Sequence, residues 1–597
     1  MPTTIEVNKQ SVEALLGSGK SKPFVIPEYQ RPYAWTDEQV ETLFEDLWDF
    51  TATSGGTERE SSYFLGSVVS YENEDGEQEI IDGQQRITSL FLLLRAIYTK
   101  LVATPASERT AEANNFIGKI EPTIWRTNKL TGTVDFKNIL LTSRVVNNEG
   151  NEILRSILET GKADEDAKDN YSKNYRHFQE LFDKHSTENP LMVYQFIYAL
   201  LNQAILLPIT ADTQDTALTI FSTLNDRGLP LSDADIFKAK IYNQLAPDDK
   251  KAFIDRWKDL DEQSTDANES IQQLFYYNMF YYRALDKDTK TTTPGVRKYY
   301  AVNKFERLYK PELLDTLFVI LNLWKVVNKG EELEDEAWSK NIKIRQTLDI
   351  LTSYPNEYWK YPVVIYYVCY RNEENFETRF ARFLNKLLME LMTKYLMIPT
   401  INAVKPDILK LNSAIVASDI PTFEFKTVDM TQLEPYIQNP NRNVVRMLLK
   451  TLAYEHQDDL LPAKWEIEHI FPQKWQMNYF PDEPDATIKE KIEHIGNKLP
   501  FEKKLNIVAG NGYFGKKKKE YIASKIVITK AMGTSDVMDW NLESITKRDI
   551  RVSDEVVKIM NRWNNEYLNT PVSEGKAGEP SEEELAQIEK FKKNGWI

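Results

Sequence analysis

The chain reads WEIEHIFP at residues 465–472, and this stretch decides the fold of the C-terminal region. Apolar and polar residues alternate up to His469, which is typical of a short strand. The later segments are HIGNKLP at 494–500, LN at 505–506 and NGYFGKKKK at 511–519. These segments together make residues 465–519 the candidate catalytic finger.

Each residue type in this set has a role in phosphodiester hydrolysis. A neutral imidazole, here that of His469, can take a proton from water near neutral pH. The oxygens of Glu468 and Asn506 are hard ligands that suit Mg²⁺ or Mn²⁺ better than zinc. Asn497 can tie the loop to the finger and orient the base. The set therefore predicts a metal-dependent nuclease.

Ordinary structural roles compete with this interpretation. A lone histidine is usually structural, asparagines near glycine are usually turn residues, and lysines 516–519 could be a solvated helix face. Asn511 and Lys516, which we take as supporting DNA contacts, belong to that part of the chain. Each ordinary role is favoured for a residue taken alone, but the ordered set is much rarer by chance. One cysteine, Cys369, excludes a disulfide framework and a cysteine-based zinc site.

A second constellation lies near the N-terminus. Residues 78–90 read QEIIDGQQRITSL and predict a strand, a glycine turn and a helix, whose first N–H groups and dipole favour an anion. Gly83 lets the backbone approach closely, and Arg86 and Arg31 can form forked contacts to phosphate. Asp82 suits a metal ion or a ribose hydroxyl. From residue chemistry alone, nucleotide binding and ordinary ion pairs at a turn are about equally expected.

Residues 465–525 resemble the HNH domain of the GmrSD-type endonucleases. The pattern E-H-I-x-P, I-G-N, L-N and N-x-x-F-x-x-K is matched at 468–472, 495–497, 505–506 and 511–516. The resemblance implies that His469 is the general base and Asn497 the structural asparagine. Asn506 is then the terminal metal ligand and Glu468 the other ligand.

Three N-terminal segments resemble the N-terminal domain of the same family, which the BrxU and SspE phage-defence proteins share. They are IPEYQRPYAW at 26–35, DGQQR at 82–86 and FSTLNDRGLPLS at 221–232. That domain is similar to the ParB/sulfiredoxin-like α/β fold, which implies nucleoside triphosphate binding and hydrolysis. The nucleotide-binding candidates carried over are Gln30, Arg31, Asp82, Gly83, Gln84, Gln85, Arg86, Asn225 and Arg227. Asp235 and Lys238 match a flanking motif and are supporting candidates.

The whole pattern predicts a multidomain, largely helical α+β protein. We expect a GmrS-like ParB-type NTP-binding domain at 1–240, a helical middle domain at 241–435 and a GmrD-like ββα-metal (HNH) nuclease domain at 436–565. A flexible linker and a short C-terminal helix would fill 566–597. Residues 102–185 are poorly patterned and predict helices with variable loops. The aromatic residues of the middle domain are expected to pack in a core rather than to stack on bases.

Bulk composition limits the classes of function. The net charge of −16 argues against a chain that coats nucleic acid by bulk electrostatics, although it leaves room for a local basic patch. The first residues have neither a basic start nor an apolar run, so we expect no signal peptide. The longest apolar stretch, 191–209, is interrupted by Gln195 and Pro208 and does not read as a membrane span. The sequence thus predicts a cytoplasmic protein without a membrane partner.

Together the two resemblances imply a single-chain type IV, modification-dependent restriction endonuclease in bacterial defence. The implied substrate is double-stranded phage DNA with hydroxymethylated or glucosylated cytosine, cut under the control of GTP, ATP or another triphosphate. One alternative is an SspE-like NTPase and nickase that senses phosphorothioate DNA. A second is a nucleotide-binding regulator whose inactive finger only grips DNA. The sequence leaves open a homodimer, the choice of triphosphate and the surface that reads the modification.

Overall fold

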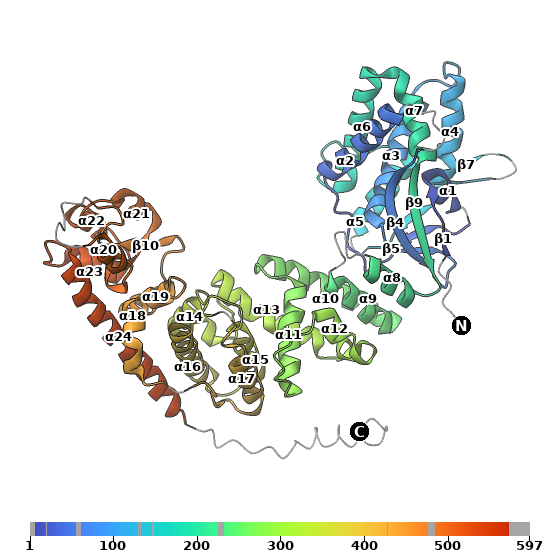
Figure 1. The fold of residues 1–597 in the computed structure, drawn as a ribbon. Coiled ribbons are helices and arrows are strands. Elements are labelled where there is room, and N and C mark those ends of the chain that lie inside the picture. Colours follow the sequence, from blue (N-terminus) through green and yellow to red (C-terminus); the bar gives the residue numbers. More distant parts are fainter. Residues whose placement is uncertain are drawn as a thin grey trace, which may run out of the picture. The chain divides into compact units, whose positions relative to one another are not determined.

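The computed structural model describes residues 6–19, 21–54, 61–128, 131, 133–145, 148–224, 232–400, 402–426, 428–475 and 484–571. The chain separates into two compact units, residues 1–259 and 260–597 (Figure 1). The first unit mixes strands and helices and the second is nearly all helical, which confirms the multidomain, mostly helical α+β prediction. The predicted boundaries at 240, 435 and 565 stay predictions. None of the described helices has the length and apolarity needed to cross a membrane.

The first unit is built on a seven-stranded mixed sheet in the order β1-β9-β4-β5-β3-β8, with β2 also pairing β9. Its strands are β1 (Glu6–Val7), β2 (Gln10–Ser11), β3 (Phe24–Ile26), β4 (Tyr63–Glu72), β5 (Gln78–Asp82), β8 (Leu141–Ser143) and β9 (Ala204–Ala211). Parallel pairs join β4 to β9 and β3 to both β5 and β8, whereas β4 and β5 are antiparallel. The strand predicted within residues 78–90 is β5, which lies between β4 and β3 in this sheet.

Both faces of this sheet are covered by helices. Successive residues of a strand point to opposite faces. Accordingly, Val68 and Ile80 join the large core that includes α3, while Val69 and Ile81 join a smaller core with α8 and α9. The helices are α1 (Val12–Ser18), α2 (Asp37–Ser54), α3 (Gln84–Ala103), α4 (Ala111–Ile124), α5 (Asn148–Thr160), α6 (Asn170–Glu188), α7 (Val193–Tyr198), α8 (Gln214–Leu224) and α9 (Asp233–Gln244).

Residues 102–185 differ in part from the expectation. Helices α4, α5 and α6 form as expected, but the region also supplies β8, which extends the sheet beside β3. A separate two-stranded pair, β6 (Trp125–Thr127) and β7 (Val134–Ile139), lies there too. Strands of three residues are too short to show an alternating pattern, so the sequence carries little signal for them.

The second unit is helical up to the finger. Helix α10 (Pro247–Asp266) leads into it, followed by α11 (Ile271–Leu285), α12 (Val296–Tyr300), α13 (Leu313–Lys329), α14 (Ile342–Leu351), α15 (Lys360–Tyr370), α16 (Phe376–Met397), α17 (Lys405–Ala417), α18 (Glu434–Gln438) and α19 (Val445–His456). Aromatic rings fill the space between them, as expected. Phe280 stacks on Tyr361 at 3.7 Å between ring centroids, and both side chains are buried.

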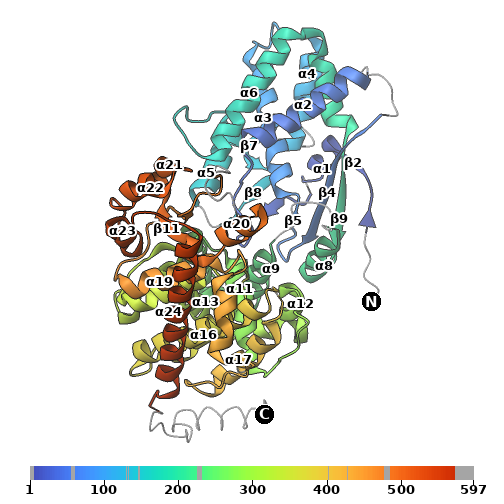
Figure 2. The ribbon, with the colours of Figure 1, turned by 60° about the vertical axis from the view of Figure 1, so that its left-hand side comes forward.

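The finger region follows, and a long helix closes the unit. Its elements are β10 (Trp465–His469), α20 (Asp485–Ile492), β11 (Lys498–Glu502), α21 (Lys503–Ala509), α22 (Phe514–Tyr521), α23 (Val527–Thr534) and α24 (Leu542–Leu568). Helix α24, dark red in Figure 2, packs against α16, α18 and α19 and against the turn at Ile495–Asn497. One helix thus contacts both the helical part of the unit and the finger.

Some predictions fall outside the described residues. They concern Asn225 and Arg227, and the chain from 572 onward with its expected C-terminal helix.

Candidate functional site

The finger forms a strand–strand–helix arrangement. β10 and β11 pair antiparallel, with Glu468 opposite Leu499 and His469 opposite Lys498, and α21 begins directly after β11. Ile470, Phe471, Leu499 and Phe501 are buried in the core of the finger. The order of elements matches the predicted ββα arrangement, and His469 stands at the end of its first strand.

His469 is held as a neutral imidazole in a partly buried position. Its side chain is 15% exposed, with Nε2 3.5 Å from a carboxylate oxygen of Glu493. Burial lowers the pKa of His469, with further lowering by Lys498 and Lys517 and an opposing effect of Glu493. A histidine with a lowered pKa is deprotonated at neutral pH and able to accept a proton.

Asn497 is fully buried and uses its whole amide in hydrogen bonds. Its Oδ1 accepts from Phe471 N at 2.7 Å and from Trp540 Nε1 at 3.2 Å. Its Nδ2 donates to Phe471 O at 3.0 Å and to Ile492 O at 3.1 Å. The side chain therefore fixes the segment that follows His469, and no part of the amide is left to contact substrate.

The two glutamates of β10 have different partners. Glu468 is 4% exposed. Its Oε1 accepts from Tyr521 Oη at 2.6 Å and pairs with Lys517 Nζ at 2.8 Å. The carboxylate beside Asn506 is that of Glu466, whose Oε2 accepts from Asn506 Nδ2 at 3.3 Å. The structure thus places Asn506 against Glu466, not against Glu468, the glutamate named from the sequence.

Lys517 is a site residue that the sequence analysis missed. Its ammonium group is buried and also donates to the carbonyl of His469, so it holds both the glutamate and the histidine of β10. The signal was present, since the F-x-x-K part of the pattern places the lysine three residues after Phe514. Lys516, which the sequence suggests as a supporting DNA contact, is exposed on α22. Asn511 exchanges hydrogen bonds with the backbone of Lys474 and so braces that loop.

Helix α24 clamps the turn that carries Asn497. Arg548 Nη1 donates to the carbonyls of Gly496 at 2.8 Å and Lys498 at 2.9 Å. Burial lowers the pKa of Arg548 to about 10, so it stays charged at neutral pH. Asp549 is 1% exposed and accepts from Gly496 N at 2.7 Å and from His494 Nδ1 at 2.8 Å. These partners lie about fifty residues from the turn in sequence, which hid them from motif reading.

The second constellation lies where β5 ends and α3 begins. Gly83 has φ +89° and precedes α3, whose N-terminus has no side-chain cap. Burial raises the pKa of Asp82, against opposing effects of the Gly83 N–H, Arg86 and Arg31. Arg86 donates to Ser67 O at 3.1 Å and packs on Gly66, where an added Cβ would lie 3.0 Å from the guanidinium carbon. The turn thus joins a carboxylate, two arginines and uncapped N–H groups.

Three glutamines of this motif hold the chain next to the turn. Gln30 Nε2 donates to Ile81 O at 3.0 Å. Gln85 accepts from Ala34 N at 2.7 Å and donates to Pro32 O at 3.1 Å. Gln84 donates to Arg31 O at 3.4 Å. Among the described atoms its Oε1 has no partner, although the residue is 5% exposed. The backbone of Arg31 is thus pinned beside α3 while its side chain is exposed.

The flanking candidates lie on α9. Asp235 closes a capping box with Ser232: its Oδ2 accepts from Ser232 N at 3.1 Å, and its own N donates to Ser232 Oγ at 3.2 Å. A structural role at the start of α9 accounts for this residue. Lys238 is half-buried on the same helix.

Comparison with protein-family models identifies both regions. Residues 12–242 match the N-terminal domain of the GmrSD restriction endonucleases, and residues 429–552 match their C-terminal domain. The chain belongs to the GmrSD restriction endonuclease family. The two matches cover more than half of the chain and place both GmrSD domains in one polypeptide, in the order that the sequence analysis predicted. A comparison with curated proteins finds no match.

Membership of the GmrSD family gives the protein its broad activity. It is a type IV restriction endonuclease, with DNA as substrate, that acts in defence against modified DNA. The C-terminal match contains the whole finger, and the N-terminal match contains the Asp82–Arg86 turn.

Proposed function

We propose that the finger cuts the DNA, with His469 as the general base. The observation that carries this proposal is the partly buried imidazole at the end of β10, where burial lowers the pKa of His469 and Asn497 fixes the following segment at Phe471. In this role the imidazole takes the proton of the attacking water. Asn497 and Lys517 position the strand end, Asn497 through Phe471 and Lys517 through the carbonyl of His469.

The donor set of β10 and α21 fits Mg²⁺ or Mn²⁺. Within the described ranges, no three His, Cys, Asp or Glu side chains gather as a metal centre. Mg²⁺, however, takes one or two carboxylates and fills its remaining positions with water and substrate phosphate oxygens. Glu466 and Glu468 share one strand face, and Asn506 adds an amide oxygen. A bound ion would polarise the scissile phosphate and stabilise the leaving oxygen.

We further propose that the Asp82–Arg86 turn binds and hydrolyses a nucleoside triphosphate that regulates cutting. Uncapped N–H groups at the start of α3 favour an anion. Arg31, held by its backbone with an exposed guanidinium group, supports phosphate binding. Asp82, Gly83, Gln84 and Arg86 complete this proposed site, and Asn225 and Arg227 remain candidates from the family pattern.

The finer identity of the substrate also belongs to the proposal. We propose hydroxymethylated or glucosylated cytosine in double-stranded phage DNA, a cytoplasmic location and no membrane partner. A homodimer and the choice between ATP and GTP stay open predictions.

The finger is tested by replacing its histidine. The variant His469→Ala should cut modified DNA about 10²- to 10⁴-fold more slowly in Mg²⁺ or Mn²⁺, because the general base is lost. His456→Ala is the matched control: His456 ends α19, outside the finger, and pairs with Glu555. Cutting by His469→Ala at the rate of His456→Ala would refute the catalytic assignment and favour a finger that only grips DNA.

The substrate is tested on a panel of DNAs. Glucosylated, hydroxymethylated, phosphorothioate and plain duplexes are compared with and without ATP or GTP. We expect cutting of the cytosine-modified duplexes and a change in rate when a triphosphate is added. Nicking of duplexes that lack phosphorothioate, together with triphosphate hydrolysis that responds to phosphorothioate DNA, would support the SspE-like alternative.

A further inference from the structure

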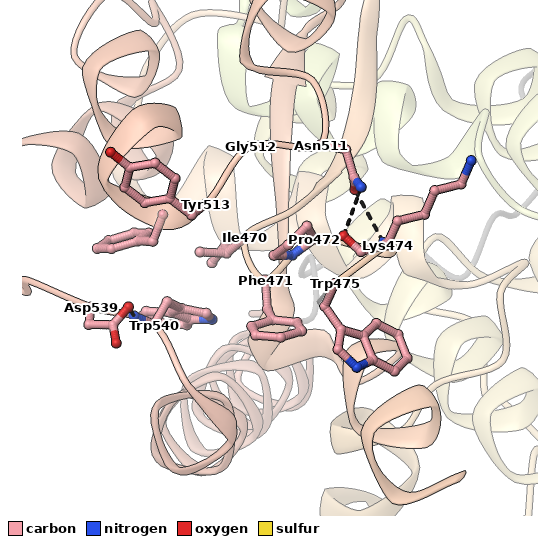
Figure 3. Close-up of a pocket in the computed structure, with 11 residues that line it drawn as sticks. Ile470, Phe471, Pro472, Lys474, Trp475, Asn511, Gly512, Tyr513, Asp539 and Trp540 are labelled. Atoms are coloured by element: carbon pink, nitrogen blue, oxygen red, sulfur yellow. Dashed lines mark hydrogen bonds between the residues drawn. The ribbon is translucent and has the colours of Figure 1, made fainter. Parts of the chain in front are cut away.

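A cavity of about 310 Å³ opens beside the finger (Figure 3). Three segments line it: residues 470–472, 474 and 475 after His469, residues 511–514 at the start of α22, and residues 539–540 ahead of α24. None of its residues is among those assigned to proton transfer or metal binding. Five of the lining residues are aromatic, which makes planar apolar surface its main feature.

The aromatic residues divide into an inner and an outer set. Phe471, Phe514 and Trp540 are 3–5% exposed, and the rings of Phe514 and Trp540 lie 5.7 Å apart between centroids. Tyr513 is 63% exposed, and Trp475 is half-buried. In Figure 3, Tyr513 and Trp475 lie on opposite sides of Phe471. The inner rings are thus fixed by packing, while the outer two present their surfaces to an incoming group.

The cavity is tied to the catalytic strand through Asn497. Phe471 N and Trp540 Nε1 both donate to Asn497 Oδ1, at 2.7 Å and 3.2 Å. The backbone N of Ile470, the residue after His469, donates to Asn497 O at 2.8 Å. A group held between these rings would therefore have a fixed position relative to His469.

We propose that this cavity takes one unstacked nucleobase of the DNA bound at the finger, a proposal that rests on the finger being the cutting site. Nucleobases have two planar apolar faces and a polar edge, and aromatic rings stack on any of them. Asp539 lines the same cavity and supplies an acceptor for such an edge. Enzymes that extrude a base hold it in a pocket of this kind, stacked between aromatic or apolar side chains. The base in the cavity sets which phosphate faces His469.

The proposal is tested by combining DNA that lacks one base with protein variants that lack one aromatic ring of the cavity. DNA binding is measured by fluorescence anisotropy with the His469→Ala protein, using modified duplexes that carry one abasic position at a time near the cut. At one position, loss of the base should weaken binding about 5- to 100-fold, the range for one stacked base. In proteins that also carry Tyr513→Ala or Trp475→Ala, the same abasic position should have little further effect. Tyr436→Ala, another exposed tyrosine of this unit, is the control and should keep the full effect.

The outcomes separate this proposal from the proposed function. The cavity does not hold a base if every abasic position, on either strand, weakens binding as much in the Tyr513→Ala and Trp475→Ala proteins as in the protein with both rings. This comparison is made with variants whose thermal stability is unchanged. If His469→Ala still cuts DNA, the catalytic assignment fails, whatever the coupling shows. Loss of cutting together with position-specific coupling supports both.

Discussion

In the finger, His469 ends β10, and Arg548 and Asp549 of α24 hold the turn at Gly496 from about fifty residues further along the chain. In the N-terminal turn, the motif residues Gln30 and Gln85 hold the adjacent segment themselves, and Arg31 is the side chain left exposed. The finger is therefore held by residues outside its motif, whereas the turn is held by residues of its own motifs, although these too lie about fifty positions apart in sequence.

This difference indicates which motif residues can contact a substrate. A side chain whose hydrogen-bond donors and acceptors are all satisfied within the protein supports the structure of the site. A side chain with unsatisfied groups can contact a substrate. By this criterion Asn497, whose four hydrogen bonds use its whole amide, supports the structure of the site, whereas Arg31, whose side chain is exposed, can contact a substrate.

The largest effect is expected where α24 meets the finger. A Cβ at Gly496 would lie 2.3 Å from Ile545 O and 2.6 Å from Asp549 Oδ1, so Gly496→Ala must displace α24 or the Asn497 turn. We expect a loss of about 1–3 kcal/mol in the free energy of unfolding, with cutting reduced. Gly295→Ala, where nothing lies within 4 Å, is the control for calorimetric unfolding. Equal stability of the two variants would contradict the clamp.

A second prediction separates the two glutamates of β10. Glu466→Gln should raise the Mg²⁺ concentration needed for half-maximal cutting by roughly tenfold or more, because a carboxylate beside Asn506 is lost. Glu468→Gln leaves the buried Lys517 without its charged partner and should mainly lower stability. Titrations of cutting rate against Mg²⁺, combined with thermal unfolding, measure both. A metal response confined to Glu468→Gln would restore that residue as the principal ligand.

A third prediction concerns pH. The imidazole must be neutral to accept a proton, so cutting is present above the pKa of His469 and lost as the pH falls through it. Because that pKa is lowered, the acid limb of kcat/KM should lie below the ordinary histidine value of 6.5. Glu493 raises the pKa of His469, so Glu493→Gln should shift the limb to still lower pH.

The control for this shift is Glu490→Gln, an exposed position on α20. A limb that stays in place in Glu493→Gln, or moves upward, would show that another group sets the acid side of the profile.

The smallest effect is expected in the N-terminal turn, where the stability of a Gln85 variant is compared with that of an Arg31 variant. Gln85→Ala removes the acceptor for Ala34 N and the donor to Pro32 O, and should lower stability by about 1–2 kcal/mol. Arg31→Ala should change stability by less than about 0.5 kcal/mol, because its side chain is exposed. Chemical denaturation compares them. The contrast fails if Arg31→Ala proves the more destabilising.

Much of the fold followed from local pattern. Strand β5 and helix α3 form where the sequence predicts the strand, glycine turn and helix of residues 78–90. Strand β8 was not predicted, because three residues are too few to show an alternation of apolar and polar residues. In the site, Asn497 ties the loop to the finger through four hydrogen bonds, which is the role that the sequence predicts for it. The clamp by Arg548 and Asp549 depends on tertiary contacts that no local pattern encodes, whereas Lys517 stands at the lysine position of the F-x-x-K pattern.

We propose that one chain carries two separate sites and that the N-terminal turn controls cutting by the finger. Triphosphate hydrolysis and DNA cutting measured on wild type, His469→Ala and Arg31→Ala test it most directly, with Arg126→Ala on β6 as an exposed arginine control. We predict that His469→Ala keeps hydrolysis and loses cutting, and that Arg31→Ala loses hydrolysis together with the response of cutting to triphosphate. Arg31→Ala that hydrolyses triphosphate and cuts like wild type would contradict the claim.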